Sequence, residues 1–273
     1  MDDHAVTLPP ASEFDAGTAV ERIADRRWRG DVSPDWTVFG GAPNGGYLQA
    51  MALRAVRGEL TKPHPLTSTS HFLTTCESGP AEIDVEVLRT GRRHETAVAT
   101  VHQADGERLR VTAIFGDLDA ADGPTWDGAE PPAIPPLDEC IAAPLDIDLP
   151  PVVRRFDVRL NPAHVGWLVN QPSGRAEMAG WLRFADGREP DVAALPLFAD
   201  ALPPVAFNVL DRLSWVPTLE LTVHVRARPA TGWLRCVFRS RGLVGGYHEE
   251  DGEIWDAEDR LVAVTRQLAL ARS

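Results

Sequence analysis

The second half of this chain repeats the layout of the first half, and this repeat limits what the chain can fold into. His71 aligns with His224, and Thr112 aligns with Thr265. Both pairs are 153 positions apart (224 − 71 and 265 − 112). In each half, a short apolar segment of helical character precedes the closing series of strand-like segments. The pattern predicts two fused copies of one supersecondary unit, in which residues that break the symmetry are candidates for chemistry.

The periodicity of apolar residues predicts the elements of each copy. A glycine-rich turn at 39–47 is followed by apolar positions with helical spacing from Leu48 to Val56, which indicates a buried helix. Strands are expected after it at 66–75, 82–90, 94–103 and 107–115. In the second half, strands are expected at 153–160, 175–185, 217–228, 233–241, 243–255 and 261–270, with a helix near 192–202. A helix followed by an antiparallel meander indicates an α+β fold.

Composition excludes several classes of protein. The formal net charge of −13 argues against nucleic acid as a partner, because no basic stripe is available to displace counterions from phosphates. No stretch approaches the roughly twenty apolar residues that a membrane helix needs. The three cysteines lack metal-ligand spacing, and no basic segment followed by an apolar run opens the sequence. We therefore expect a cytoplasmic protein with reduced thiols.

The two halves meet in a segment of distinct composition. Residues 117–151 contain nine acidic residues, eight prolines and no lysine or arginine. Such a segment neither continues a strand ladder nor forms a long helix. We interpret it as a linker between an N-terminal domain, 1–116, and a C-terminal domain, 152–273. Trp126 and the apolar residues around Ile141 are expected to pin parts of it to a surface.

Short motifs in both halves carry a resemblance to a known family. The first half contains NGGYL at 44–48, SHFL at 70–73 and VEVLRTGR at 85–92, and the second contains TLELTVH at 218–224 and LVAVTRQ at 261–267. In their order and spacing these motifs resemble the acyl-CoA thioesterase II family. The resemblance implies a double hotdog, in which each of two tandem units has a long helix wrapped by a curved antiparallel sheet.

The resemblance also implies a reaction and the residues that perform it. Members of the family hydrolyse acyl-CoA with a water held by an aspartate, a threonine or serine, and a glutamine, which correspond here to Asp200, Thr218 and Gln267. An aspartate can accept a proton from water while a hydroxyl and an amide fix its orientation. Direct attack by the carboxylate to form an anhydride remains an alternative.

The glycine-rich turn is the candidate substrate-binding segment. Asn44, Gly45 and Gly46 open the first helix, where backbone N–H groups could stabilise a tetrahedral intermediate. The repeat indicates one catalytic centre per chain, because an offset of 153 aligns Gln267 with the aliphatic residue Ile114. The first helix also has no acidic residue before Gly58.

Each candidate has a structural alternative. Asp200 could cap a helix or pair with a cation, and Gln267 could be a solvated side chain of an edge strand. Thr222 competes with Thr218, because strand periodicity puts both on one face. The strand that begins at Thr218 is one residue longer than expected, and a register shift of one would turn its hydroxyl to the other face.

Prolines, charged residues and tryptophans outside the proposed catalytic group give further expectations about the structure. Pro196 and the pair Pro203-Pro204 imply that the helix bearing Asp200 is short or kinked. We interpret His248-Glu249-Glu250 as a hairpin tip. Candidates for the coenzyme A phosphate site are Arg89, Arg92, Arg239 and Arg241. We interpret most tryptophans of the second half as core or subunit contacts, and an acyl pocket is the alternative. These residues are Trp167, Trp181, Trp215, Trp233 and Trp255.

The sequence therefore predicts a cytoplasmic acyl-CoA thioesterase. Coenzyme A is part of its substrate, and no metal or redox cofactor, nucleic acid or membrane span is expected. Paired hotdog sheets expose apolar surface, so we expect a homodimer or larger homo-oligomer. One alternative is a non-catalytic acyl-CoA or lipid-binding hotdog protein. The other is a hotdog dehydratase or hydratase, which requires a catalytic histidine on a helix, and neither predicted helix contains one.

Overall fold

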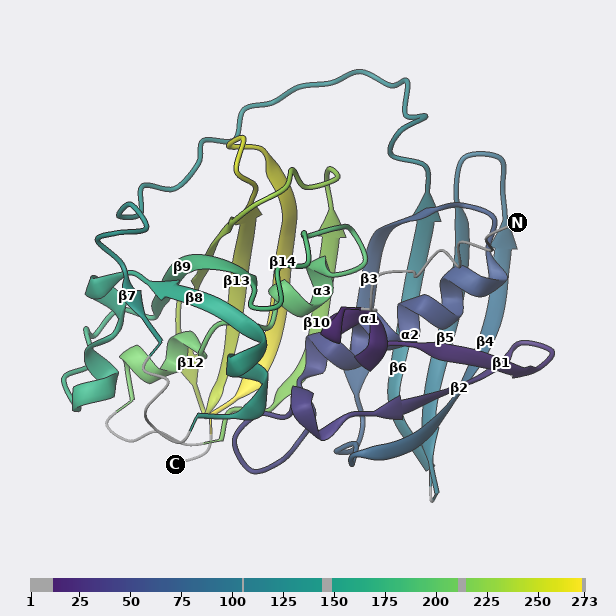
Figure 1. The fold of residues 1–273 in the computed structure, drawn as a ribbon, viewed down its shortest axis with the longest axis horizontal. Helices are drawn as coiled ribbons and strands as arrows, with labels where there is room; N and C mark the ends of the chain where they lie inside the picture. The colour runs from purple at the N-terminus through teal and green to yellow at the C-terminus, as the bar shows by residue number, and fades with distance from the viewer. Residues whose placement is uncertain (1–11, 105, 144–148, 211–214, 272–273) are drawn as a thin grey trace, which may run out of the picture.

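The computed structural model describes residues 12–104, 106–143, 149–210 and 215–271, which form one antiparallel sheet with helices on its inner face (Figure 1). Strands of the N-terminal half are β1 (Val20–Ala24), β2 (Arg27–Val32), β3 (His64–Phe72), β4 (Gly79–Thr90), β5 (Glu95–Gln103) and β6 (Gly106–Gly116). Strands of the C-terminal half are β7 (Ile141–Ala142), β8 (Phe156–Leu160), β9 (Glu177–Phe184), β10 (Thr218–Val225), β11 (Leu234–Arg239), β12 (Leu243–Val244), β13 (Tyr247–Trp255) and β14 (Leu261–Leu270).

The helical elements are few and short. The α-helices are α1 (Glu13–Gly17), α2 (Gly45–Glu59) and α3 (Leu195–Phe198). The 3-10 helices are η1 (Pro34–Trp36), η2 (Pro151–Arg155), η3 (Pro162–His164), η4 (Gly166–Val169) and η5 (Val205–Asn208). None of the helices in the described ranges is long and apolar enough to cross a bilayer.

The strand order has the symmetry that the repeat predicts. The sheet runs β1-β2-β4-β5-β6-β3-β10-β14-β13-β11-β9-β8-β7, so the two halves are arranged in mirror order about the β3–β10 junction. At this junction Thr69 lies opposite Thr222, and their hydroxyls are 2.8 Å apart. These two residues are separated by 153 positions, which is the offset found in the sequence.

The last strand of each unit departs from this offset by one residue. Thr69 lies opposite Thr112 in the N-terminal half, whereas Thr222 lies opposite Arg266 in the C-terminal half. The chain between β10 and β14 is therefore one residue longer than the chain between β3 and β6. The alignment of Thr112 with Thr265 is wrong by one position.

Helix α2 forms the centre of the N-terminal half. The Asn44 side chain caps it by accepting a hydrogen bond from the Tyr47 N–H at 2.9 Å. Small residues such as Ala52 and Ala55 are completely buried, which lets the curved sheet approach the helix closely. Figure 1 shows α2 lying across the strands of this half, as the sequence predicts.

The C-terminal half lacks an equivalent long helix. The helix expected near 192–202 is limited to the single turn of α3, because Pro196 occupies its first turn and Pro203-Pro204 prevent continuation. The prediction of a short helix from these prolines is confirmed. The expectation of a long helix in each unit is wrong for the second unit.

The linker passes over one end of the sheet from β6 to β7 (Figure 1). Ile141 lies in β7, which pairs with the edge strand β8, so this part is attached as expected. Trp126 does not pin the linker, because its side chain is 89% exposed. The Trp181 indole instead holds the segment by donating to the carbonyl of Pro135 at 2.9 Å.

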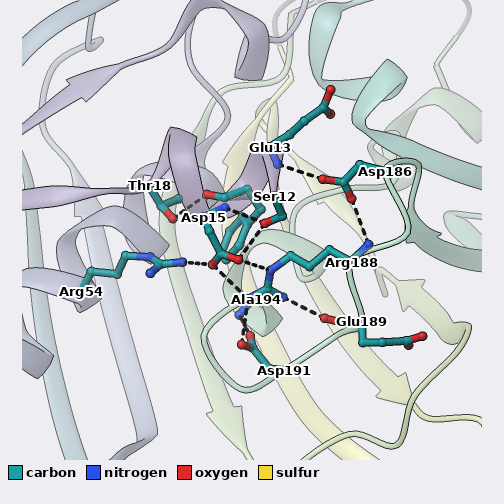
Figure 2. Close-up of polar contacts among 11 residues, drawn as sticks. Ser12, Glu13, Asp15, Thr18, Arg54, Asp186, Arg188, Glu189, Asp191 and Ala194 are labelled. Carbon is teal, nitrogen blue, oxygen red and sulfur yellow. Dashed lines mark hydrogen bonds and ion pairs between the residues drawn. The ribbon is translucent and has the colours of Figure 1, made fainter. Parts of the chain in front are cut away.

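An ionic cluster joins α1 to both halves (Figure 2). Asp15 on α1 accepts hydrogen bonds from Arg54 on α2 and from Arg188, whose Nε lies 2.9 Å from an Asp15 oxygen. Arg188 also pairs with Asp191, a few residues before α3, at 2.8 Å. The cluster therefore fixes the segment that leads into α3 against α2.

Candidate active site

A cavity of about 580 Å³ lies where α2, α3 and the inner face of the C-terminal strands meet. Its walls are mostly apolar side chains, among them Phe72, Leu160 and Phe207. The predicted residues that line it are Asn44, Gly45, Asp200, Thr218 and Gln267. The structure thus brings the three candidate catalytic side chains to one cavity, although they are distant in sequence.

Asp200 lies just after α3 and faces the first turn of α2. Its Oδ2 accepts a hydrogen bond from the Gly46 N–H at 3.0 Å, and the Asn44 side-chain amide donates to its backbone carbonyl at 2.7 Å. Desolvation by burial raises the pKa of Asp200 to about 6, against the opposing effect of the Gly46 and Gly45 N–H groups. The group is therefore ionised at neutral pH and is a stronger base than an ordinary aspartate.

Gly46 is required by the close approach of α2 and α3. A β-carbon at this position would lie 2.2 Å from the carbonyl oxygen of Pro196 and 3.0 Å from the β-carbon of Asp200. The Gly46 N–H, a predicted donor to a reaction intermediate, is directed at the Asp200 carboxylate instead. The N-terminus of α2 thus stabilises the carboxylate of the candidate base, Asp200.

Thr218, Gln267 and a further carboxylate form a hydrogen-bonded chain. The Thr218 hydroxyl donates to Gln267 Oε1 at 2.9 Å, and Gln267 Nε2 donates to Glu250 Oε1 at 2.8 Å. The second oxygen of Glu250 accepts from the Val205 N–H at 3.1 Å. Val205 follows the Pro203-Pro204 pair, so the chain returns to the segment that carries Asp200.

Thr222 is directed away from this chain. A β-bulge between Thr218 and Glu220 places Thr218 opposite Ala269, whereas Thr222 lies opposite Arg266. Directly opposed residues share a face and neighbours along a strand alternate, so Thr218 shares the inner face with Gln267 and Thr222 does not. The expectation that Thr218 and Thr222 lie on one face is wrong. The extra residue noticed in the sequence is this bulge.

Glu250 is the residue that sequence reasoning missed. Residues 248–250 belong to strand β13, and the hairpin tip is Gly245-Gly246, so the interpretation of His248-Glu249-Glu250 as a tip is wrong. Burial alternates back along β13 from Ile254 through Glu250. Counting in twos from Ile254 would have placed this carboxylate inside.

Glu250 is in a strongly desolvated environment. Only 5% of the residue is exposed. Burial raises its pKa to about 7, with a smaller contribution in the same direction from the charge of Asp200. Asp200 lines the cavity, and Glu250 contacts Gln267, which also lines it. Two carboxyl groups with raised pKa values therefore belong to this part of the molecule, a pattern that marks functional sites.

Other candidates from the sequence lie elsewhere or contribute to the walls. Arg239 pairs with Glu177 at 2.8 Å and Arg241 with Asp251 at 3.4 Å. The cavity is lined by Arg108 rather than by any of the four predicted arginines, as far as the described residues show. Trp167 and Trp215 line the cavity, so these two tryptophans stay candidates for the acyl-pocket alternative.

One group of side chains outside the cavity has the geometry to share a cation. His64, Asp117 and Asp119 present ligand atoms within 4.8 Å of one another. Asp119 already pairs with Arg228 at 2.7 Å, and its side chain is 58% exposed. Exposed acidic groups are common without an ion, so this group does not add to the candidate site.

Comparison with known proteins assigns the fold class. A conserved protein of unknown function with a hot dog fold from Alicyclobacillus acidocaldarius has a TM-score of 0.84 at 26% identity, covering 96% of this chain and 99% of that chain. A candidate thioesterase II from Thermobifida fusca has a TM-score of 0.88 at 34% identity, with coverage of 98% and 100%. The predicted α+β double hotdog is confirmed.

Sequence comparison identifies the family. Residues 32–116 match the acyl-CoA thioesterase N-terminal domain, and residues 121–271 match the acyl-CoA thioesterase C-terminal domain. An uncharacterized protein of Mycobacterium tuberculosis is 30% identical over 276 residues, or 90% of this chain and 91% of that protein. The chain belongs to the family defined by these two acyl-CoA thioesterase domains, as its motifs predict.

Proposed function

We propose that this protein hydrolyses an acyl-CoA thioester to a free carboxylic acid and coenzyme A. The observation that supports this most strongly is the position of Asp200. Its carboxylate, with a raised pKa, lies at the N-terminus of α2 and lines the same largely apolar cavity as the hydrogen-bonded pair Thr218 and Gln267.

In the proposed reaction, a water molecule beside Asp200 attacks the thioester carbonyl. Asp200 accepts one proton from the water as the new C–O bond forms. The tetrahedral intermediate then collapses with cleavage of the C–S bond, and the proton passes from Asp200 to the departing sulfur. The reaction consumes one water and requires no oxidant, reductant or further group.

The environment of Asp200 suits this role. A general base is most effective when its pKa lies close to the working pH, and burial raises the pKa of Asp200 to about 6. Thr218 and Gln267 would hold the water in the attacking orientation. The apolar walls formed by Phe72, Trp167 and Phe207 suit a hydrocarbon chain, and a volume of about 580 Å³ is in the range of ligand pockets.

The test is a panel of acyl-CoA substrates assayed with a thiol-trapping reagent. Wild-type protein should release coenzyme A, and Asp200→Asn should reduce kcat about a hundredfold or more, the scale of removing a positioned acid–base group. Asp157→Asn is a suitable control, because Asp157 pairs with Arg183 on β9 and is not among the residues that line the cavity.

Two outcomes contradict the proposal in different ways. Binding of acyl-CoA without release of the thiol would identify a non-catalytic binding protein. Equal rates for wild type and Asp200→Asn would reject the role of Asp200.

A further inference from the structure

We infer that Glu250 is a positioning residue of the hydrolytic site, which sets the orientation of the Gln267 amide and thereby leaves the Thr218 oxygen free to accept a hydrogen bond from the reacting water. The inference rests on the proposed function and adds a residue to it. Glu250 does not need to touch the substrate, because it acts through Gln267.

The orientation of Gln267 follows from the chemistry of its partner. Once Glu250 has lost its proton, its carboxylate has only acceptors, so the Gln267 group that lies 2.8 Å from Glu250 Oε1 must be the NH₂ group. The carbonyl of the same amide then points to Thr218. A glutamine in contact with a hydroxyl alone could adopt either orientation, so Glu250 removes this ambiguity.

The orientation of the amide determines what Thr218 can offer. A hydroxyl has one hydrogen, and that of Thr218 is donated to Gln267 Oε1 at 2.9 Å. The oxygen of Thr218 therefore presents only lone pairs to the cavity. A water can donate one hydrogen to Asp200 and the other to Thr218, which leaves a lone pair of the water for attack on the carbonyl carbon.

The opposite orientation would work against the reaction. If Gln267 presented its NH₂ group to Thr218, the hydroxyl hydrogen would turn to the cavity and compete for the lone pair that attacks. Glu250 also accepts from the Val205 N–H at 3.1 Å. It thus ties the segment that follows Asp200 to the strand that carries Gln267.

The duplicated fold shows that a carboxylate is not required at this place in the sheet. Across the C-terminal half, Leu221, Gln267 and Glu250 lie opposite one another on β10, β14 and β13. Across the N-terminal half, the corresponding row is Ser68, Ala113 and Ala97. Gln267 and Glu250 are both replaced by alanine, as expected if the two residues act together.

The direct test is Glu250→Gln, which keeps the shape of the side chain but provides one acceptor and one donor. The variant amide cannot satisfy both Val205 N–H and Gln267 NH₂, so the orientation of Gln267 is no longer fixed. We expect kcat to fall about 10- to 100-fold, with KM changed less than about twofold. Equal kcat in wild type and Glu250→Gln would overturn the inference.

Glu95→Gln is the matched control. Glu95 is 1% exposed and holds the Thr61 and Lys62 N–H groups at 2.7 and 3.0 Å, so it is also a buried glutamate that accepts from backbone. It is not among the residues that line the cavity. Its substitution should leave kcat unchanged, and an equal loss of kcat in both variants would assign Glu250 a structural role only.

A double-mutant cycle separates positioning through Gln267 from any other effect. In a Gln267→Ala background, Glu250→Gln should reduce kcat by less than about threefold, because the group it positions is absent. Reductions that multiply would overturn the inference. Wild-type protein without thioesterase activity would instead reject the proposed function, and this inference with it.

The pH profile of the wild type provides a test that needs no variant. Asp200 must be ionised as the base and Glu250 as the acceptor, and their pKa values are raised to about 6 and about 7. Protonation of Glu250 should lower kcat by the same factor of about 10 to 100 as Glu250→Gln, and protonation of Asp200 should lower it further, so the acid limb should contain two ionisations. An acid limb that fits a single ionisation would contradict the role of Glu250.

One other side chain that lines the cavity can take up a proton in the same acid range. Burial lowers the pKa of His248 below its ordinary value, whereas burial raises the pKa of Cys76 to about 11. Arg108 carries a fixed charge. In Glu250→Gln, the acid limb should become a single step near the pKa of Asp200, and a second step that persists in this variant would assign it to His248 and contradict the inference.

Discussion

The two halves of the molecule share strand order but differ in what lies on their inner faces. In the N-terminal half, the 15-residue helix α2 packs on strands whose inner residues are small and apolar, such as Ala97 and Ala113. In the C-terminal half, the helix is reduced to α3, and Gln267 and Glu250 occupy the corresponding strand positions. The first copy thus keeps a filled core, whereas the second has a cavity with polar groups.

The candidate site is built from both copies. The N-terminal half supplies the capped start of α2, whose Gly46 N–H binds Asp200. The C-terminal half supplies the carboxylate, the hydroxyl and the amide.

The largest effect is expected from placing the acid of the second copy into the first. Ala97 is completely buried on a strand packed against α2, so Ala97→Glu introduces a carboxylate without a partner. We expect the free energy of unfolding to fall by about 3 to 5 kcal/mol in urea denaturation. Thr96→Glu, on the opposite face of the same strand, should cost less than about 1 kcal/mol, and equal values would mean that the first copy has space for a polar group.

The contact between α2 and α3 is tested by Gly46→Ala. The added methyl would overlap the Pro196 carbonyl, so α3 must move and Asp200 with it. We expect a loss of about 2 to 3 kcal/mol in stability and at least a tenfold loss in kcat. Gly123→Ala in the linker meets nothing within 4 Å and should change neither quantity.

The cost of burying the Asp200 carboxylate is tested by the free energy of unfolding of Asp200→Asn. Because the folded-state pKa of Asp200 is raised from 3.8 to about 6, the folded protein binds more protons than the unfolded chain between these values, and stability falls as pH rises through this window. The variant should therefore be more stable than wild type by about 2 to 3 kcal/mol at pH 8, with the difference disappearing below about pH 4. A variant less stable than wild type at pH 8 would show that Asp200 is a structural group.

A smaller effect is expected where α1 joins the halves. Hydrogen bonds from Arg188 and Arg54 hold the pKa of Asp15 below its usual range, despite the opposing effect of desolvation, so its contribution to stability is present at neutral pH and is lost as acid protonates it. Allowing for partial exposure, Asp15→Asn should cost about 1 kcal/mol at pH 7 in thermal or urea unfolding. Asp25→Asn removes an exposed charge paired with Arg22 and should leave the free energy of unfolding almost unchanged. Equal losses of stability in Asp15→Asn and Asp25→Asn would contradict the stabilising role of the cluster around Asp15.

The sequence predicts the strands of both copies well because their apolar alternation is strong. The sequence does not predict strands β1 and β2, because Val20–Ala24 is a mostly polar, exposed edge strand and Arg27–Val32, which lies next to it, is also mostly polar and exposed. The short α3 could be predicted because proline acts locally on the backbone. Residues 1–11 lie outside the described residues, while Glu13 and Asp15 belong to α1.

The candidate site could be predicted only in part. Asp200, Thr218 and Gln267 came from the resemblance, and the structure brings them to one cavity. The face of Thr218 depends on a bulge that periodicity does not reveal, and the inward position of Glu250 depends on the register of β13 with β14. The counterpart of Gln267 is Ala113 rather than Ile114, because one added residue shifts the last strand.

The central claim is that a water molecule, activated by Asp200, attacks the thioester directly. Its most direct test is hydrolysis over many turnovers in H₂¹⁸O, followed by mass spectrometry of the acid product and of the peptide that contains Asp200. Direct attack predicts ¹⁸O in the carboxylic acid and none in the Asp200 peptide. Label in Asp200 would show that the carboxylate itself attacks the thioester and forms an anhydride, which contradicts a role for this residue as general base.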